Sequence, residues 1–129
     1  MIVDSSALVA VLLKEPGHEV LVRTLEAAAT AGVGAPTLVE TGIVLVARLG
    51  IMGKTLLARF VTEAGLEVVP LTEEHWPVAV DAFSRYGKGR HAAALNFGDC
   101  LTYAVARLAD VPLLCIGDDF VKTDLALAL

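Results

Sequence analysis

The sequence predicts an α/β fold of three layers, in which helices flank a short, mostly parallel central sheet of four to five strands. Short and almost wholly apolar segments alternate with longer helical ones, as expected when helices cover both faces of a parallel sheet. The chain has 129 residues, of which 56% are hydrophobic and 19% charged. It is long enough to bury a core, and we expect a single domain spanning 1–129.

Hydrophobic periodicity and Gly or Pro residues set the expected elements. Strands are predicted at 1–4, 66–71 and 111–117, with a strand or connector at 33–36. Helices are predicted at 5–13, 18–31, 37–50, 53–65, 72–87 and 96–110, and 118–129 ends the chain as a turn or short helix. Ser5 or Ser6 is expected to cap the first helix and Thr72 the fifth, because hydroxyl oxygens accept hydrogen bonds from the free backbone N–H groups at a helix start.

Charge and cysteine content exclude several classes of protein. The net charge of −5 argues against binding nucleic acid by bulk attraction, although a metal held by acids would reverse the sign locally. Cys100 and Cys115 lie in apolar surroundings without metal-ligand spacing, which favours free thiols in a reducing compartment. No segment reaches the about 20 apolar residues of a membrane span, and the N-terminus lacks a secretory pattern. We therefore expect a cytoplasmic protein.

Acidic residues recur where apolar segments begin or end. Asp4 follows the first strand, Asp99 lies in the first turn of a helix, and Glu40 lies among apolar helix neighbours. Asp118 and Asp119 follow the last strand. Because active sites of parallel sheets lie beyond the carboxyl ends of the strands, these acids are expected to meet there.

Most of these acids also have a purely structural explanation. Asp99 could complete a capping box with Asn96, and Asp4 could be a turn residue. Glu40 is harder to explain in this way, since no Lys or Arg lies three or four positions from it and a buried lone carboxylate is costly. Converging carboxylates need a shared proton or a cation. Oxygen ligands select Mg²⁺ or Mn²⁺, ions that commonly serve phosphate chemistry.

Four segments together resemble a known family. "MIVDSSALVAVLL", "APTLVETG", "NFGDCLTYAVA" and "LLCIGDDFVKTDL" are similar, in order and spacing, to the acidic motifs of PIN-domain ribonucleases and, more narrowly, of VapC toxins from VapBC toxin–antitoxin pairs. The resemblance covers essentially the whole chain. It implies a PIN-like fold and an endoribonuclease toxin that uses Mg²⁺, or alternatively Mn²⁺, to activate water. It also implies a homodimer and a VapB-like antitoxin whose C-terminal segment covers the acidic site.

The resemblance also implies roles for individual residues. Asp4 and Asp99 would be the principal metal ligands. Glu40 would act as a ligand through water or as a base, and Ser6 would orient Asp4 or a phosphate. The last acid is expected to be Asp118, which comes first after the strand, with Asp119 as the alternate. If this segment is extended, neighbouring side chains face opposite ways, so only one of the two would enter the pocket.

A basic, Gly-containing loop precedes the motif that holds Asp99. It is expected either to be a solvated loop or to contact RNA phosphates, with Tyr86 stacking on a base. Its basic residues are Arg85, Lys88, Arg90 and His91. The apolar helices at 37–49 and 55–64 carry more hydrophobic surface than a monomer of this size would bury, which indicates contacts with a second copy or an antitoxin.

Two other classes of protein remain as alternatives. A receiver-like phospho-acceptor module would carry its acid pair after the first strand and a Lys after the last one. Here the pair follows the last strand and no Lys directly follows a strand. A catalytically inactive PIN-like module that only binds a partner would not need all four acidic positions, and this chain keeps them.

Overall fold

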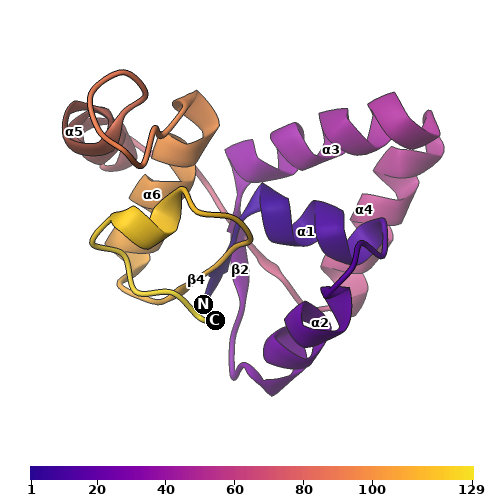
Figure 1. The fold of residues 1–129 in the computed structure, drawn as a ribbon. Helices are drawn as coiled ribbons and strands as arrows, with labels where there is room; N and C mark the ends of the chain where they lie inside the picture. Colours follow the sequence, from indigo (N-terminus) through magenta and orange to yellow (C-terminus); the bar gives the residue numbers. More distant parts are fainter.

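Helices cover both faces of one parallel sheet in the computed structural model, which describes all 129 residues (Figure 1). The four strands lie in the order β3-β2-β1-β4, and every neighbouring pair is parallel. The α/β fold predicted from the sequence is confirmed. The elements are β1 (Ile2–Val3), α1 (Ser5–Leu12), α2 (His18–Ala27), β2 (Gly32–Gly34), α3 (Ala35–Leu49), α4 (Met52–Glu63), β3 (Glu67–Val69), α5 (His75–Tyr86), α6 (Phe97–Ala109), β4 (Leu113–Leu114) and the 3₁₀ helix η1 (Phe120–Lys122).

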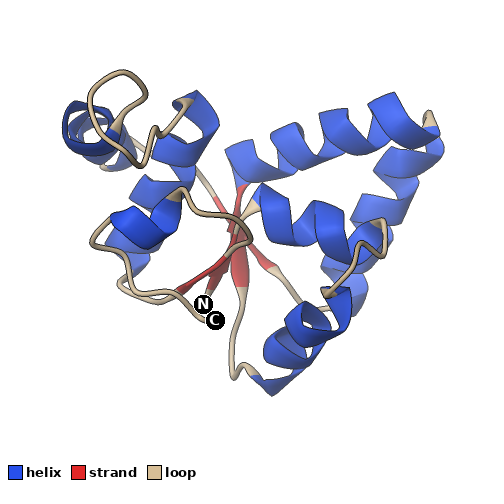
Figure 2. Ribbon diagram, in the orientation of Figure 1, coloured by secondary structure: helices blue, strands red, loops and turns tan.

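The strands are very short and form a narrow band between the helices (Figure 2). Side chains alternate across the sheet, so consecutive residues feed different cores. Ile2 packs with residues of α5 and α6, whereas Val3 packs with residues of α1 and α2. Two apolar clusters thus lie on opposite faces, which is why these strands consist almost wholly of hydrophobic residues and glycine.

The order in which the chain adds strands to the sheet switches from one side of β1 to the other. The chain places β2 and then β3 on one side of β1, and the last crossover through α5 and α6 brings β4 to the other side. In open parallel sheets, ligands bind outside the carboxyl ends of the strands where the order switches. Asp4 directly follows β1 at this switch point, and its backbone N–H donates to the carbonyl of Leu114 in β4 at 2.9 Å.

Two predicted helix caps are wrong. Asp4, rather than Ser5 or Ser6, caps α1, because its carboxylate accepts from the backbone N–H of Ser6. Glu74, rather than Thr72, holds the N-cap position of α5 and makes no side-chain cap. The Thr72 hydroxyl instead accepts from the backbone of Glu74 at 3.3 Å.

Several element ends follow from local chemistry. Gly50 ends α3 with a φ of 71°, a conformation that glycine adopts without steric cost. The predicted second helix runs to residue 31, but α2 ends at Ala27 and the chain turns toward β2. No helix in the structure combines the length and apolar character that a membrane crossing requires.

Candidate active site

Asp4 lies buried at the end of β1, with its carboxylate held by its own helix start. Asp4 Oδ2 accepts from the Ser6 hydroxyl at 2.7 Å and from the Ser6 backbone N–H at 3.1 Å. The same hydroxyl accepts from the backbone N–H of Ile116 at 3.0 Å. Ser6 therefore links the first acid to the loop that leaves β4, and this loop carries the last acidic pair.

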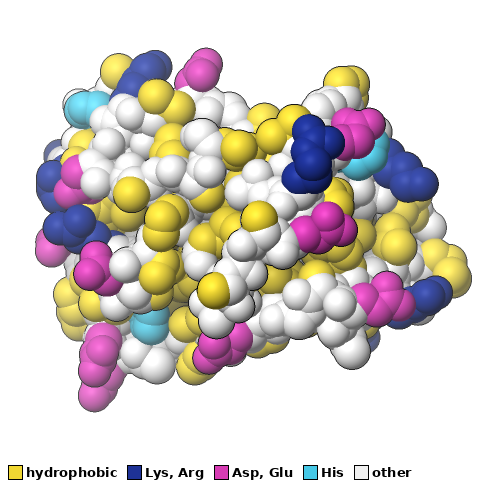
Figure 3. Space-filling view, turned by 90° about the horizontal axis from the view of Figure 1, so that it is seen from below, with side chains coloured by type: hydrophobic (Ala, Val, Ile, Leu, Met, Phe, Trp, Pro, Cys, Tyr) yellow, Lys and Arg dark blue, Asp and Glu magenta, His cyan; other side chains and the backbone are white.

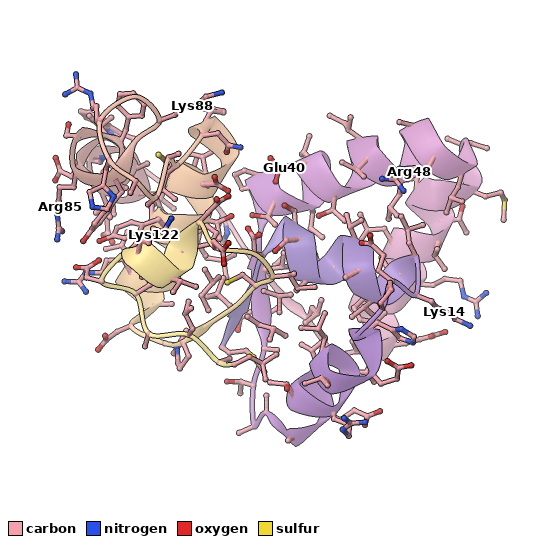
Figure 4. All side chains as sticks on the ribbon, in the orientation of Figure 1. Lys14, Glu40, Arg48, Arg85, Lys88 and Lys122 are labelled. Carbon is pink, nitrogen blue, oxygen red and sulfur yellow. The ribbon has the colours of Figure 1, made fainter.

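Glu40 lies in the second turn of α3, near the same region, and is half-buried. The Ser5 hydroxyl donates to Glu40 Oε1 at 2.5 Å. The other oxygen, Oε2, packs against Gly98 in the first turn of α6. Figure 4 shows Glu40 near the start of α3, on the side that faces α6.

Asp99 is fixed by a reciprocal capping box at the start of α6. Its backbone N–H donates to Asn96 Oδ1 at 2.9 Å, and the Asn96 backbone N–H donates to Asp99 Oδ2 at 3.1 Å. The structural explanation offered for Asp99 is thus confirmed. It leaves the second carboxylate oxygen, Oδ1, without a bond to the protein.

Asp99 is partly buried and lies close enough to other acids for their charges to act on its pKa. Burial raises the pKa of Asp99 to about 6, against the opposing effect of the hydrogen bond from Asn96. The negative charges of Asp4, Asp119 and Glu40 raise this pKa further. Carboxylates from four separate segments therefore repel one another at this edge of the sheet, which is the situation that a bound cation relieves.

Of the last acidic pair, Asp119 is the member whose charge contributes to the raised pKa of Asp99. The same charge also affects Cys115. Burial, with further contributions from Asp4, Asp119 and Asp99, raises the pKa of the Cys115 thiol to about 11. The segment is not extended here, because Gly117 turns the chain with a φ of 98°. The alternation that assigned one acid to the pocket therefore does not apply.

The donor set fits a hard divalent cation. All four acids offer carboxylate oxygens, and the thiols of Cys100 and Cys115 beside them have raised pKa values, which keep them protonated. As the side chains stand, no three His, Cys, Asp or Glu residues are arranged to hold a metal directly. Mg²⁺ suits such a site, since it usually keeps several water ligands and takes only one or two carboxylates.

The basic loop divides into residues with and without protein partners. Arg85 donates to Asp124 Oδ2 at 3.4 Å and points away from Glu40 (Figure 4). The Arg90 guanidinium lies 5.5 Å from the centre of the Phe83 ring. Lys88, by contrast, is exposed and its side chain makes no hydrogen bond or ion pair, so it is the member that is free to contact a phosphate.

Tyr86 does not offer the stacking surface predicted for it. Its side chain is buried in the core, its hydroxyl accepts from Arg85 at 2.8 Å, and the edge of the His91 ring lies against it at a centroid distance of 5.1 Å. His91 Nδ1 in turn accepts from the backbone N–H of Ala93 at 3.0 Å. Tyr86 thus shapes the loop from inside, and the exposed His91 packs against it from the solvent side.

Surface charge agrees with the acidic composition. On the face shown in Figure 3, acidic and basic side chains are interspersed and hydrophobic side chains lie between them. No continuous basic surface covers that face.

Ser5 and Gly98 contact Glu40, and Asp119 acts on the pKa of Asp99. The sequence predicted no such role for Ser5 and Gly98 and placed Asp119 second to Asp118. Ser5 was considered only as a helix cap, and its partner lies 35 positions away in the chain. Gly98 carried one usable signal, since a glycine in a helical first turn indicates a close approach by another group.

The model of the PIN domain family matches residues 1–125 of this chain. Ribonuclease VapC36 of Mycobacterium tuberculosis is 52% identical over 126 residues, which cover 97% of this chain and 91% of the relative. Ribonuclease VapC30 of the same species is 38% identical, with 98% and 96% covered. The crystal structure of Mycobacterium tuberculosis VapC20, a sarcin-ricin loop cleaving toxin, superposes with a TM-score of 0.80 at 20% identity and covers 97% of this chain and 95% of that one. The chain belongs to the PIN domain family and, within it, to the VapC ribonuclease toxins.

Proposed function

We propose that this chain is a metal-dependent endoribonuclease toxin that hydrolyses phosphodiester bonds of RNA. The observation that carries the proposal is the convergence of four carboxylates, from Asp4, Glu40, Asp99 and Asp119, at the switch point of a parallel sheet. In this proposal Asp119 takes the place of Asp118 as the fourth acid, because the charge of Asp119 contributes to the raised pKa of Asp99. The cation is Mg²⁺, with Mn²⁺ as a substitute of similar ligand preference.

Each residue has a distinct task in this proposal. Asp4 and Asp99 would hold the cation, whose chemistry when bound would be to polarise the phosphate and to lower the pKa of a water molecule. Glu40 accepts the proton of the attacking water on a carboxylate oxygen or holds a water of the coordination shell. Ser6 keeps Asp4 Oδ2 in one direction through its hydroxyl. Lys88 contacts a phosphate next to the cleaved bond.

RNA cleavage by the purified protein tests the proposal. We expect a mixed-sequence RNA to be cut in the presence of Mg²⁺ or Mn²⁺, and cleavage to stop when EDTA is added and to return with excess metal. Asp99→Asn should abolish cleavage, while Asp81→Asn, which changes an exposed acid on α5, should not. Cleavage that persists both in EDTA and in the Asp99→Asn variant would refute the metal-dependent mechanism.

We further propose that the protein forms a homodimer in the cytoplasm and that residues 1–129 act as one domain. Large apolar side chains on α5 stand exposed, which favours contact with a second copy. They include Trp76 and Val80. The two cysteines are free, as expected in a reducing compartment. Light scattering coupled to size-exclusion chromatography should give twice the mass of the chain.

A VapB-like antitoxin is the second proposed partner. The toxin–antitoxin complex VapBC2 from Rickettsia felis, bound to a promoter DNA fragment, shares the fold, with a TM-score of 0.76 at 14% identity and 98% and 95% of the two chains covered. This chain offers an apolar surface to such a partner, because a groove of about 820 Å³ runs between α3 and α4. An antitoxin segment in that groove would reach Glu40 through the adjoining recess of about 450 Å³ between α3 and α6.

A further inference from the structure

The carboxylate of Glu40 differs from the other acids in how it is held. Asp4 and Asp99 are fixed by the starts of the helices that follow them. Glu40 lies inside α3, and both of its oxygens meet residues of other helices. Its direction is therefore set by contacts across the fold and not by its own backbone.

Ser5 of α1 holds the first of these oxygens. Its hydroxyl donates to Glu40 Oε1 at 2.5 Å, and the contact is partly buried. A hydrogen bond to an ionised carboxylate is shorter and stronger than one between neutral groups. Because no ion pair involving Glu40 is present, the Ser5 hydroxyl is its charge-stabilising partner within the protein.

Gly98 of α6 makes room for the second oxygen. A Cβ atom at this position would overlap Glu40 Oε2, at a separation that real side chains do not reach. The backbone itself does not require glycine, since Gly98 lies in a helix and is not among the residues with positive φ. Alanine would be the better helix former here, so the position is left empty for the carboxylate.

We propose that Ser5 and Gly98 are positioning residues for Glu40, with Ser5 fixing Oε1 and the missing side chain at position 98 admitting Oε2 next to Asp99. The inference rests on the proposed function, in which Glu40 serves the metal-dependent site. Neighbouring groups that orient a ligand without touching the metal commonly contribute about 10- to 100-fold to metal affinity or activity.

Gly98→Ala tests the inference most directly. The atom that a new Cβ meets is the far end of a flexible side chain, so the protein should fold and the Glu40 carboxylate should move. We expect a melting temperature equal to or above that of the wild type, together with losses of Mn²⁺ affinity and of cleavage rate that match those of Glu40→Gln. Electron paramagnetic resonance of free Mn²⁺ measures the affinity without any substrate.

Gly42→Ala is the matched control. Gly42 also lies in a helix, but a Cβ there would meet only Leu57 Cδ2, at the ordinary contact distance of 3.6 Å. This variant should bind Mn²⁺ and cleave RNA as the wild type does. If Gly98→Ala behaves like Gly42→Ala in both measurements, the inference about Gly98 is wrong.

Ser5 provides an independent test by loss and rescue. Ser5→Ala removes the donor and should lower Mn²⁺ affinity or cleavage about 10- to 100-fold, whereas Ser5→Thr keeps a hydroxyl and should restore most of it. A purely structural role would lower the melting temperature in Ser5→Ala and leave the properties of the folded protein unchanged. That result would overturn the inference about Ser5.

Combining each change with Glu40→Gln separates this inference from the proposed function. In the Glu40→Gln background, neither Ser5→Ala nor Gly98→Ala should cause a further loss, and multiplying losses would contradict the inference. A wild type that binds Mn²⁺ but cleaves no RNA would refute the proposed function alone, since the affinity measurements still decide the roles of Ser5 and Gly98. A wild type that binds no Mn²⁺ would refute both.

Discussion

Asp99 combines a structural and a chemical task in one side chain. One carboxylate oxygen accepts from the backbone of Asn96 and closes the capping box of α6, while the charges of Asp4, Glu40 and Asp119 act on the whole group. The capping box favours the ionised carboxylate, and burial together with the three neighbouring charges disfavours it. The second influence is the stronger, so the pKa of this helix-cap carboxylate is raised to about 6, and only near or below that pH does a cation have to displace a proton from it.

The raised pKa of Asp99 predicts how stability depends on pH in the metal-free protein. Between its usual value and about 6 the folded state binds more protons at Asp99 than the unfolded state does. The contribution of Asp99 to the free energy of unfolding is therefore full below the usual range and declines as pH rises through about 6. Urea unfolding from pH 4 to 7.5 in EDTA should show this decline, and Asp99→Asn should flatten it.

The opposite trend is expected for metal affinity. A proton and a cation compete for the Asp99 carboxylate, so Mn²⁺ binding should weaken as pH falls below about 6. An affinity that stays constant between pH 5 and pH 7 would contradict the assignment of Asp99 as a ligand.

At the scale of single elements, the C-terminal segment is tied to α5 and α6 through Asp124. The Tyr103 hydroxyl donates to Asp124 Oδ1 at 2.7 Å, and Arg85 and Arg107 lie 3.4 and 3.8 Å from Oδ2. The hydrogen bond from Tyr103 and the two arginine charges lower the pKa of Asp124. The segment held in this way also carries η1 and, just before it, Asp119.

Asp124→Asn should destabilise the protein by about 1 kcal/mol at pH 7, because it weakens a hydrogen bond and two half-exposed ion pairs. A lowered pKa means that this stabilisation exists above the usual range of Asp and is lost as pH falls through it. The difference from wild type in urea unfolding should therefore shrink toward pH 3. Asp81→Asn, at an exposed acid, should show no such difference at either pH.

The order of elements was predictable because each depends on local pattern. Helical periodicity and glycines such as Gly50 placed α3 and its neighbours within a few residues, and the apolar runs of β1 and β4 were visible despite their length of two residues each. Helix caps were less predictable. A carboxylate just before a helix competes with the serines inside it, and Asp4 prevails over Ser5 and Ser6.

At the scale of the whole molecule, contacts between segments distant in the chain could not be predicted from the sequence. The choice between Asp118 and Asp119 depends on how Gly117 turns the chain after β4, and the role of Ser5 depends on an approach by α3. Tyr86 was expected at the surface because its neighbours are basic, yet it fills the core beside Tyr103. That the acids lie at one edge of the sheet was predictable, because the carboxyl ends of parallel strands meet at the same edge.

The apolar surface of α3 joins the acid site to the groove proposed for the antitoxin. Val39, Ile43 and Val46 recur on one side of the helix and are 62%, 65% and 39% exposed. Val39 and Ile43 line both the recess next to Glu40 and the groove between α3 and α4. In the proposed complex, a single antitoxin segment would therefore fill both the groove and the recess and end beside Glu40.

Ile43→Glu should consequently uncouple toxicity from neutralisation. The side chain is mostly exposed, so the variant should fold and cleave RNA, yet a charge in the apolar groove should weaken antitoxin binding by about 1–3 kcal/mol. Growth of cells that express the variant together with the cognate antitoxin should stop, whereas the wild-type pair should permit growth. Thr55→Glu adds the same charge at an exposed position on α4 that does not line the groove, and it should remain neutralised. Neutralisation of Ile43→Glu as complete as that of Thr55→Glu would show that the antitoxin binds elsewhere, because a buried glutamate without a partner cannot be accommodated in an apolar interface at no cost.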